Sequence, residues 1–281
     1  MLSYRHAFHA GNHADVLKHY VLASMLAYLN QKDKAYWYID THAGAGCYQL
    51  DSQYAAKNAE YATGIARLLG RQDLPPGLAE YVQLVRELNP DGQLKLYPGS
   101  PWVALQMLRP ADKLRLFELH PTDFPLLEEN MREAGRQALA QKGDGFAGLK
   151  AMLPPPPRRA LTLIDPPYED KKDYQRVVVA LEDALKRFPT GVYALWYPLL
   201  QRSEPRQMIS QLKQLPVKSW LHVTLSVHQP REDGFGMHGS GLFILNPPWM
   251  LHDELKANLP YLRDVLGLDQ GASYVLEQQA G

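Results

Sequence analysis

Apolar residues recur along this chain at two spacings, and stretches of one spacing alternate with stretches of the other. From Ala14 to Leu29 they recur at helical spacing, which predicts an amphipathic helix. The next apolar run, Tyr36 to Ile39, is short and continuous, as is typical of a buried strand. Helical patterns such as Tyr174 to Phe188 separate most of the later apolar runs. This alternation predicts an α/β fold with a doubly wound, mostly parallel sheet.

Further strands are expected in the later apolar runs, and the last two of them should form a hairpin. The runs are Lys113–Leu119, Leu161–Ile164, Val192–Tyr197, Trp220–Val227 and Gly241–Leu245. The segment from Gln229 to Gly239 is too short to hold a crossover helix. We therefore expect the last strand to run antiparallel to its neighbour.

The segment after the first strand is too long for one crossover connection. About seventy residues separate it from Lys113, whereas compact α/β units use short connections. Helical patterns at about 58–69 and 78–88 occupy the excess. We predict an inserted helical subdomain at 48–97, and a main α/β domain formed by 1–47 and 98–281. Ser100 is expected to be the N-cap of the next crossover helix, with Pro101 at its first position.

Composition limits the possible partners and compartments. The 281 residues include 30 basic and 30 acidic ones, so any site for a polyanion must be a local patch. A single cysteine, Cys47, excludes a disulfide framework and a multi-cysteine metal site, and fits a reducing compartment. Neither a signal-type apolar region nor a membrane-spanning run is evident. We expect a soluble, cytoplasmic protein that does not bind a membrane.

The tetrad Asp165-Pro166-Pro167-Tyr168 follows a strand and has the chemistry needed to methylate a planar amine. The lone pair of such an amine is delocalised into its ring. The carboxylate of Asp165 can accept one N–H and the carbonyl of Pro166 the other, which directs the nitrogen toward an electrophilic methyl group. The prolines remove competing backbone donors, and the ring of Tyr168 offers a face on which a base can stack.

A second tetrad, Asn246-Pro247-Pro248-Trp249, shows that these letters alone are insufficient. Either tetrad can be a simple turn, since Asp, Asn and Pro all favour turns. Ligands of open α/β sheets lie at the carboxyl ends of the parallel strands. Asn246 should end a strand of opposite direction, so we interpret the second tetrad as a structural turn at the opposite edge.

Three acidic or glycine-containing positions indicate a nucleoside cofactor. The turn Asp40–Gly46 keeps Gly44 and Gly46 of a dinucleotide fingerprint, but Gln49 stands where a third glycine is needed. Glu118 ends the next strand and is placed to accept bonds from ribose hydroxyls. Asp144, expected after the following helix, has a position suited to an adenine amine. Each of the three alone also fits a structural turn or a surface carboxylate.

Histidines and basic residues allow weaker hypotheses. Histidines at 6, 9, 13 and 19 raise the possibility of a metal, but neither a carboxylate nor a cysteine completes a recognisable ligand set, so no metal is expected. A basic cluster near the tetrad could hold phosphates or be an ordinary solvated surface. It comprises Arg158, Arg159, Lys171, Lys172 and Arg176.

Taken together, these residues resemble the RlmJ family of adenine-N6 methyltransferases of 23S ribosomal RNA. The resemblance covers nearly the whole chain and is carried by six segments besides the tetrad. They are 2–6, 8–19, 40–46, 97–101, 118–121 and 144–146. Position 47 and the stretch 201–236 match least.

The resemblance implies a fold, a cofactor and residue roles. The fold is the Rossmann-like fold of S-adenosylmethionine-dependent methyltransferases, with a mostly parallel seven-stranded sheet, an antiparallel last strand and a small helical insertion. Large-subunit ribosomal RNA is the implied substrate, Asp165 the catalytic acceptor, and Tyr4 a substrate contact. Besides Gly44 of the glycine turn and Asp165 itself, the implied cofactor contacts are Lys18, His19, His42, Ser100, Glu118, Asp144 and Gly145.

Other functions use some of the same features. A DNA adenine methyltransferase needs the same tetrad, whereas a methyltransferase acting on protein amides usually has Asn at its first position. A non-catalytic RNA-binding module would function without Asp165. Of these functions, we expect adenine-N6 methylation of ribosomal RNA by a monomer.

Overall fold

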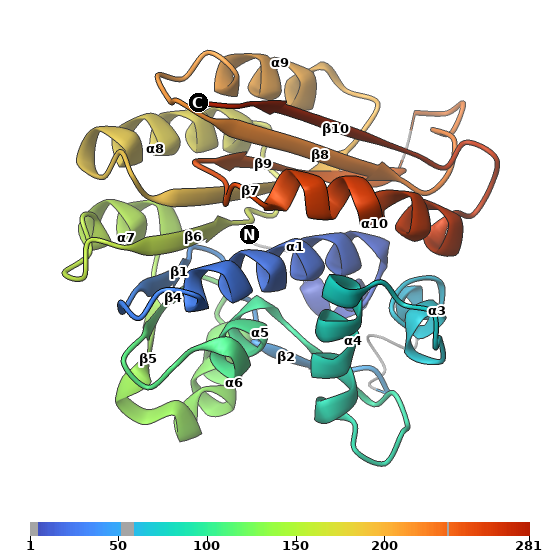
Figure 1. Cartoon of the computed structure of the whole chain (residues 1–281), viewed down its shortest axis with the longest axis horizontal. Coiled ribbons are helices and arrows are strands. Elements are labelled where there is room, and N and C mark those ends of the chain that lie inside the picture. Colours follow the sequence, from blue (N-terminus) through green and yellow to red (C-terminus); the bar gives the residue numbers. More distant parts are fainter. Residues whose placement is uncertain (1–4, 52–58, 235) are drawn as a thin grey trace.

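A computed structural model describes residues 5–51, 59–234 and 236–281 (Figure 1). In this part of the chain, the main sheet has eight strands in the order β10-β8-β9-β7-β6-β1-β4-β5. Their bounds are β1 (Trp37–Asp40), β4 (Lys113–Glu118), β5 (Ala138–Lys142), β6 (Ala160–Ile164), β7 (Val192–Leu199), β8 (Trp220–Ser226), β9 (Gly239–Leu245) and β10 (Ser273–Gln279).

The directions of the strands agree with the predicted fold. Strands β5, β4, β1, β6 and β7 are parallel. Strand β9 lies antiparallel between β7 and β8, which confirms the predicted hairpin. The edge strands β5 and β10 were not predicted, because neither contains a continuous apolar run and most of their residues are partly or fully exposed. Asp144 consequently follows a strand and not a helix.

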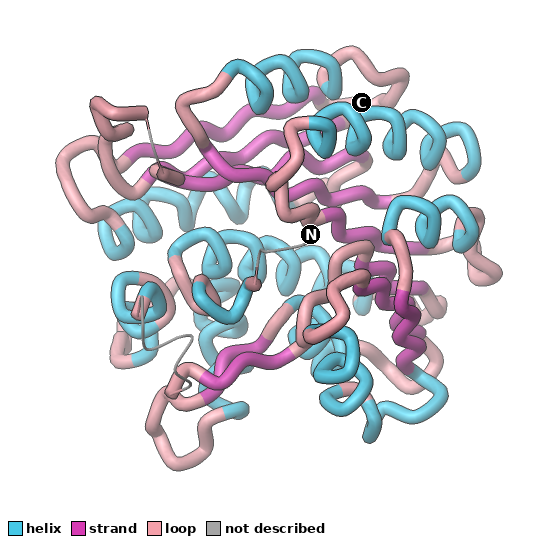
Figure 2. The backbone as a smooth tube through the Cα atoms, turned by 180° about the vertical axis from the view of Figure 1, so that it is seen from behind, coloured by secondary structure: helices cyan, strands magenta, loops and turns pink. Residues whose placement is uncertain are grey.

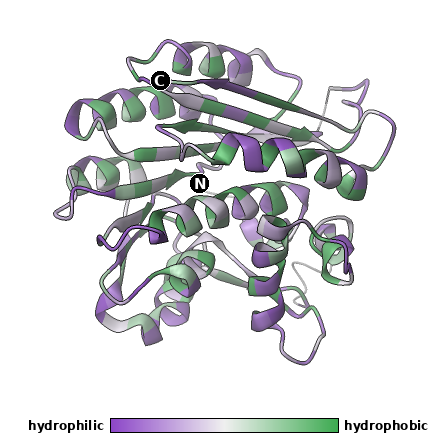
Figure 3. Ribbon diagram, in the orientation of Figure 1, coloured by the Kyte–Doolittle hydropathy of each residue, from purple (hydrophilic) through white to green (hydrophobic). Residues whose placement is uncertain are grey.

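Helices cover both faces of the sheet (Figures 1 and 2). One side carries α1 (His13–Asn30), α4 (Pro76–Leu88), α5 (Ser100–Met107) and α10 (Leu251–Leu266). The other side carries α7 (Gly145–Met152), α8 (Lys172–Arg187) and α9 (Ser203–Leu212). Neighbouring strand residues alternate between the two cores: Tyr38 packs in the first and Ile39 in the second. The central strands are accordingly coloured as hydrophobic in Figure 3.

Helix α1 is more deeply buried than an amphipathic surface helix. It contacts β9 of the sheet and also α4, α5 and α10, which cover the sides that the sheet leaves open. Even the charged Asp15 and Lys18 and the polar His19 are buried, each less than a tenth exposed. The predicted helix is therefore confirmed, but it is buried on nearly all sides and is not the amphipathic helix that the apolar spacing predicts. Its polar residues have to find partners inside the protein.

The segment predicted as an insertion begins and ends in a small ribbon. Strand β2 (Cys47–Gln49) pairs antiparallel with β3 (Leu96–Pro98). Between them lie the short helices η2 (Glu60–Thr63) and α3 (Ala66–Leu69), followed by α4. Gly64 lies between the first two helices. A Cβ at this position would be 2.1 Å from the Gly11 carbonyl oxygen, so only glycine allows the two segments to approach this closely. The division into domains 1–47 with 98–281 and 48–97 stays a prediction.

The second tetrad lies where strand direction predicted it. Asn246 follows β9, and its Nδ2 donates to the carbonyls of Pro189 and Gly191 just before β7 begins. This is the edge opposite to the carboxyl ends of the parallel strands.

Three further short elements complete the described chain. They are η1 (His6–Phe8), α6 (Asp123–Asn130) and η3 (Arg132–Gln137). Among the helices described, none combines the length and the apolar character that a bilayer crossing requires.

Candidate active site

A cavity of about 800 Å³ opens at the carboxyl ends of the parallel strands. It is large enough for a nucleoside cofactor and part of a second ligand. Every residue predicted to contact the cofactor lines it, together with Pro166 and Pro167 of the tetrad. These contacts remain predictions, because they concern a ligand. Tyr4 lies outside the described residues.

The glycine turn after β1 brings backbone close to the cavity. Gly44 and Gly46 have φ of 59° and 79°, values at which other residues are strained. A Cβ on Gly44 would also lie 2.1 Å from the hydroxyl of Tyr48. The Gly44 N–H donates to Oε2 of Glu118 at 2.7 Å, so the turn and the end of β4 are joined.

Glu118 is a rigid acceptor at the end of β4. Its Oε1 accepts the N–H of His120 at 2.6 Å, while Gly44 occupies Oε2. Burial raises the pKa of the Glu118 carboxyl, and the two backbone donors oppose this effect. Carboxylate oxygens have further lone pairs, so Glu118 can still accept bonds from two vicinal hydroxyls.

Asp144 and Gly145 form the start of α7 beside Glu118. Asp144 is the N-cap, and its Oδ1 accepts the N–H of Phe146 at 2.8 Å. Its Oδ2 accepts a bond from Arg176 at 2.7 Å. A Cβ on Gly145 would lie 1.8 Å from the carbonyl oxygen of Thr41, so glycine is needed for α7 to approach β1 this closely.

His42 is a neutral aromatic part of the cavity wall. Burial lowers the pKa of its ring to about 4. Its Nδ1 lies 2.8 Å from the Thr41 hydroxyl, and its ring meets that of Phe146 edge-on with centroids 5.2 Å apart. The His42 ring thus gives the cavity a flat, uncharged surface.

Ser100 is oriented by a buried carboxylate. Its Oγ donates to Oδ2 of Asp40 at 2.7 Å, and Tyr38 donates to the same oxygen at 2.8 Å. Burial raises the pKa of Asp40 to about 6, against the lowering effect of these bonds. The prediction that Ser100 caps its helix is wrong: Gly99 is the N-cap, and the Ser100 hydroxyl is used by Asp40 instead.

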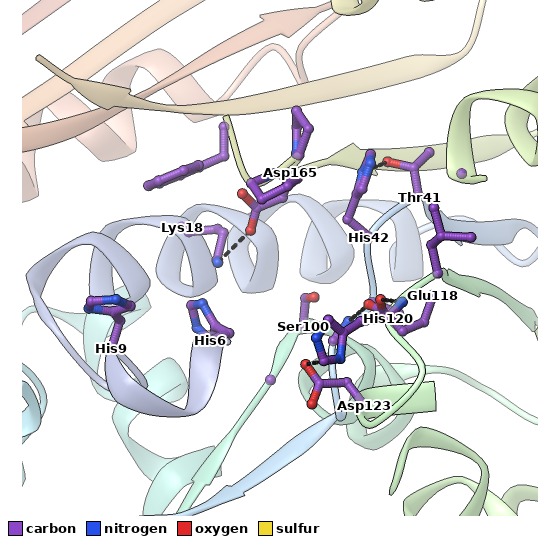
Figure 4. Close-up of a pocket in the computed structure, with 18 of the residues that line it drawn as sticks. His6, His9, Lys18, Thr41, His42, Ser100, Glu118, His120, Asp123 and Asp165 are labelled. Atoms are coloured by element: carbon purple, nitrogen blue, oxygen red, sulfur yellow. Dashed lines mark hydrogen bonds and ion pairs between the residues drawn. The ribbon is translucent and has the colours of Figure 1, made fainter. Parts of the chain in front are cut away.

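Asp165 meets a lysine from the buried helix α1. Nζ of Lys18 lies 2.7 Å from Oδ2 of Asp165 (Figure 4). The same atom lies 2.9 Å from Oδ1 of Asp15. Burial opposes the charge of Lys18, but the two carboxylates raise its pKa above the usual value. Burial alone would raise the pKa of Asp15, yet His6 and Lys18 hold it well below its usual range.

Tyr168 lies differently from the sequence prediction. Its φ of 52° turns the side chain into the second core, where the residue is 5% exposed. The hydroxyl donates to the Trp196 carbonyl, and the ring lies 4.6 Å from that of Tyr174. The ring face predicted to stack on a base is therefore packed inside the protein.

His19 connects the cavity to the segment 48–97. Its Nδ1 lies 2.9 Å from the Tyr97 hydroxyl, which lies 2.9 Å from the hydroxyl of Tyr81 on α4. Burial lowers the pKa of His19 to about 3, so the ring is neutral.

Neither weaker hypothesis is supported by the side-chain positions. His6 bonds to Asp15 and His9 to Glu60. Among the described residues, no three His, Cys, Asp or Glu side chains gather where they could hold a metal ion.

The predicted basic cluster is divided between distant places. Arg159 precedes β6 and donates to the carbonyls of Lys34 and Leu29, at the opposite end of that strand from Asp165. Lys171 pairs with Glu204 and Arg176 with Asp144. The error came from treating sequence neighbours as spatial neighbours, although a strand separates them.

Several cavity residues were not identified from the sequence. Asp15 was missed, although its three-residue spacing from Lys18 on a predicted helix was a usable signal. Trp196, Pro198 and Met237 also line the cavity, from β7 and the loop before β9. They carry no motif, so only the fold reveals them.

Comparison with known proteins identifies close relatives over almost the full length. The family model described as "Ribosomal RNA large subunit methyltransferase D, RlmJ" matches residues 33–277. The chain is 50% identical over 266 residues to "Ribosomal RNA large subunit methyltransferase J" of Escherichia coli (strain K12), covering 95% of this chain and 94% of that protein. The protein of the same name from Haemophilus influenzae is 45% identical, covering 99% of this chain and 98% of the relative.

The fold also matches a solved structure. A protein of Legionella pneumophila str. Philadelphia 1, known from its crystal structure, is 36% identical and superposes with a TM-score of 0.89. The match covers 96% of this chain and 98% of that one.

Proposed function

Because the chain belongs to the RlmJ family of ribosomal RNA large subunit methyltransferases, we propose that it methylates N6 of an adenine in 23S ribosomal RNA. S-adenosylmethionine is the proposed donor. The observation that carries this proposal is the position of Asp165, which faces the same cavity as Glu118 and Asp144. An amine acceptor and a nucleoside-binding set thus share one space.

The residues of the cavity fit this cofactor. Glu118 would hold the ribose hydroxyls, because both its oxygens are fixed by backbone donors. His42 would contact the adenine, with Asp144 at its amine. Lys18, His19 and Ser100 would lie at the methionine end, near Asp165. When bound, S-adenosylmethionine supplies an electrophilic methyl group on a positively charged sulfur.

Asp165 would activate the target amine. Lys18 holds Oδ2, so Oδ1 is the oxygen we assign to accept one N–H of the adenine amine. The carbonyl of Pro166 would accept the other, which directs the nitrogen lone pair toward the methyl carbon. As the new N–C bond formed and the sulfur–methyl bond broke, S-adenosylhomocysteine would leave as a neutral thioether. The nitrogen would lose one proton, and Oδ1 is the acceptor assigned to it. A base turned out of its stack is required, and looped RNA makes that less costly.

Labelled methyl transfer tests the proposal. The substrates are protein-free 23S RNA, assembled large subunits, DNA and protein, each with the wild type and with Asp165→Ala. Label should enter N6 of adenine in RNA with the wild type only. Label in DNA or protein but not in RNA would refute the proposal, as would full activity of Asp165→Ala.

Other expectations from the sequence remain predictions. These are a monomeric state, a cytoplasmic location and a contact between Tyr4 and the RNA. We do not include base stacking by Tyr168 in the proposal, because its ring packs against Tyr174.

A further inference from the structure

A chain of three buried side chains leads from segment 48–97 to the cavity. Tyr81, Tyr97 and His19 are each at most 1% exposed. The Tyr97 hydroxyl lies 2.9 Å from the Tyr81 hydroxyl and 2.9 Å from Nδ1 of His19. The rings of His19 and Tyr97 are 5.6 Å apart and inclined by 32°, so the imidazole is also held by packing.

The hydrogens of these three hydrogen-bonded side chains can be arranged in two directions. In one, Tyr81 donates to Tyr97 and Tyr97 donates to Nδ1 of His19, so that both hydroxyl hydrogens are bonded. In the other, Nδ1–H donates to Tyr97 and Tyr97 donates to Tyr81, which leaves the hydrogen of Tyr81 without an acceptor among the described residues. A buried donor without a partner is strongly disfavoured. The first direction is therefore favoured.

This direction determines which nitrogen of His19 carries the proton. Burial lowers the pKa of the ring to about 3, so it holds one proton at neutral pH. With Nδ1 acting as an acceptor, that proton is on Nε2. Since His19 lines the cavity, the ring contributes a neutral hydrogen-bond donor to it.

The neighbouring Ser100 has the opposite polarity. Its hydroxyl hydrogen is donated to Asp40, so its oxygen faces the cavity as an acceptor. Both residues line the cavity, and His19 directly follows Lys18, which bonds to Asp165. A donor and an acceptor there match the two charged groups of an amino acid, the carboxylate and the ammonium.

Building on the proposed cofactor, we infer that Tyr97 is a positioning residue: it keeps the proton of His19 on Nε2, and this N–H binds the carboxylate of the cofactor's methionine moiety. Tyr81 orients Tyr97. Tyr81 and Tyr97 thereby affect recognition of the cofactor, although neither lines the cavity.

The tautomer can be measured directly in the wild-type protein. Long-range ¹H–¹⁵N NMR on histidine-labelled protein distinguishes protonated from unprotonated ring nitrogens, and the His19→Gln variant identifies the His19 signal. We expect Nε2 protonated and Nδ1 unprotonated. A proton on Nδ1 would overturn the inference without affecting the proposed function.

Binding of two ligands tests what the donor recognises. S-adenosylhomocysteine and its decarboxylated analogue differ only in the carboxylate. Tyr97→Phe should weaken binding of the first about tenfold, as expected for a bond to a charged group, and leave binding of the second unchanged. Tyr36→Phe is the matched control. It removes a buried hydroxyl that bonds to Asn30 just before β1 begins, at the end of the strand opposite to the cavity, and it should change neither affinity.

Two substitutions of His19 separate recognition from packing. The amide nitrogen of Gln reaches a position similar to Nε2, whereas that of Asn corresponds to Nδ1. His19→Gln should therefore bind S-adenosylhomocysteine more tightly than His19→Asn, with no such difference for the decarboxylated analogue. Equal losses for both ligands in Tyr97→Phe, or equal binding by the two His19 variants, would overturn the inference. Failure of the wild type to bind S-adenosylhomocysteine would instead refute the proposed cofactor.

Discussion

At the scale of residues, the candidate site depends on charges that the protein has taken out of water. Lys18 lies between Asp15 and Asp165, and only Asp165 is appreciably exposed, at 16% of its side chain. Removing the central cation would take from Asp165 its ion-pair partner and leave Asp15 with His6 alone as a charged partner. The ion pair is therefore needed both to position Asp165 and to keep α1 in place.

Lys18→Met should lower the free energy of unfolding by about 3 kcal/mol, because it leaves buried charges unpaired. Adding Asp15→Asn should recover part of this loss, since the second change removes one of those charges. Denaturant unfolding of the two single variants and the double variant measures the coupling. Additive losses would show that Lys18 does not compensate Asp15.

Asp40 makes stability depend on pH in an unusual direction for a carboxylate. Burial raises its folded-state pKa to about 6, above the ordinary value of about 3.9. Its contribution to stability is fully present below the unfolded-state pKa and is lost as pH rises through the folded-state value. Relative to Asp40→Asn, the wild type should lose about 2 kcal/mol between pH 4 and pH 7. Denaturant unfolding across this range checks the slope, and a parallel pH dependence of the two proteins would contradict it.

At the scale of elements, strand direction separates two similar tetrads. Asn246 has a φ of 52°, which asparagine tolerates better than most residues, and it bonds two carbonyls before β7. Its side chain thus stabilises a turn.

Asn246→Ala should lower the free energy of unfolding by about 2 kcal/mol, through two lost hydrogen bonds and backbone strain. Asn246→Gly should cost less, because glycine adopts this φ without strain. Methyl transfer and binding of S-adenosylhomocysteine should be unchanged in both folded variants. Severe loss of transfer would mean that the second tetrad, and not Asp165, is the catalytic one.

The start of helix α7 needs a residue without a side chain. Gly145→Ala would place a Cβ 1.8 Å from the Thr41 carbonyl and displace the helix from the cavity. We expect at least a tenfold loss of affinity for S-adenosylhomocysteine, measured by calorimetry, and a loss of about 2 kcal/mol in stability. Gly143→Ala is the control, since its Cβ would meet no atom within 4 Å. Equal behaviour of the two variants would refute the steric explanation.

The elements that sequence predicted well are those with continuous apolar runs or strong helical periodicity. Strands β6 and β9 are fully buried along their length, and their runs were recognised. Edge strands such as β10 alternate weakly and carry no such signal. The residues that line the cavity followed the same rule. Asp165, Glu118 and Gly44 were predicted because each ends or follows a recognisable strand, whereas the positions of Trp196 and Met237 depend on the tertiary structure alone.

At the scale of the whole molecule, segment 48–97 is tied to the rest of the chain at several points. Arg67 donates to the carbonyls of Val265 and Gly267, at the C-terminal end of α10. The N–H of Ile65 bonds to the Gly11 carbonyl, and Tyr81 reaches α1 through Tyr97. These contacts predict that the segment does not unfold alone.

Native-state hydrogen exchange tests this cooperativity. The opening that exposes the amides of α4 should have a free energy close to that of the central strands β1 and β4. Both opening free energies should fall together as denaturant is added. Opening of α4 at several kcal/mol less than the strands would show that 48–97 is an independent folding unit, as its predicted status as a subdomain allows.

Deep burial of α1 also limits when the protein can become active. Helix α1 carries Lys18 and His19, yet it is covered by β9 and α10, which follow it by about two hundred residues. Contacts so distant in sequence form late, because a long loop must close first. During synthesis, the first helix must therefore remain without its covering elements until β9 and α10 have been made. An enzyme proposed to modify ribosomal RNA thus cannot assemble its own cofactor site until the ribosome that makes it has translated about two hundred residues beyond Lys18 and His19.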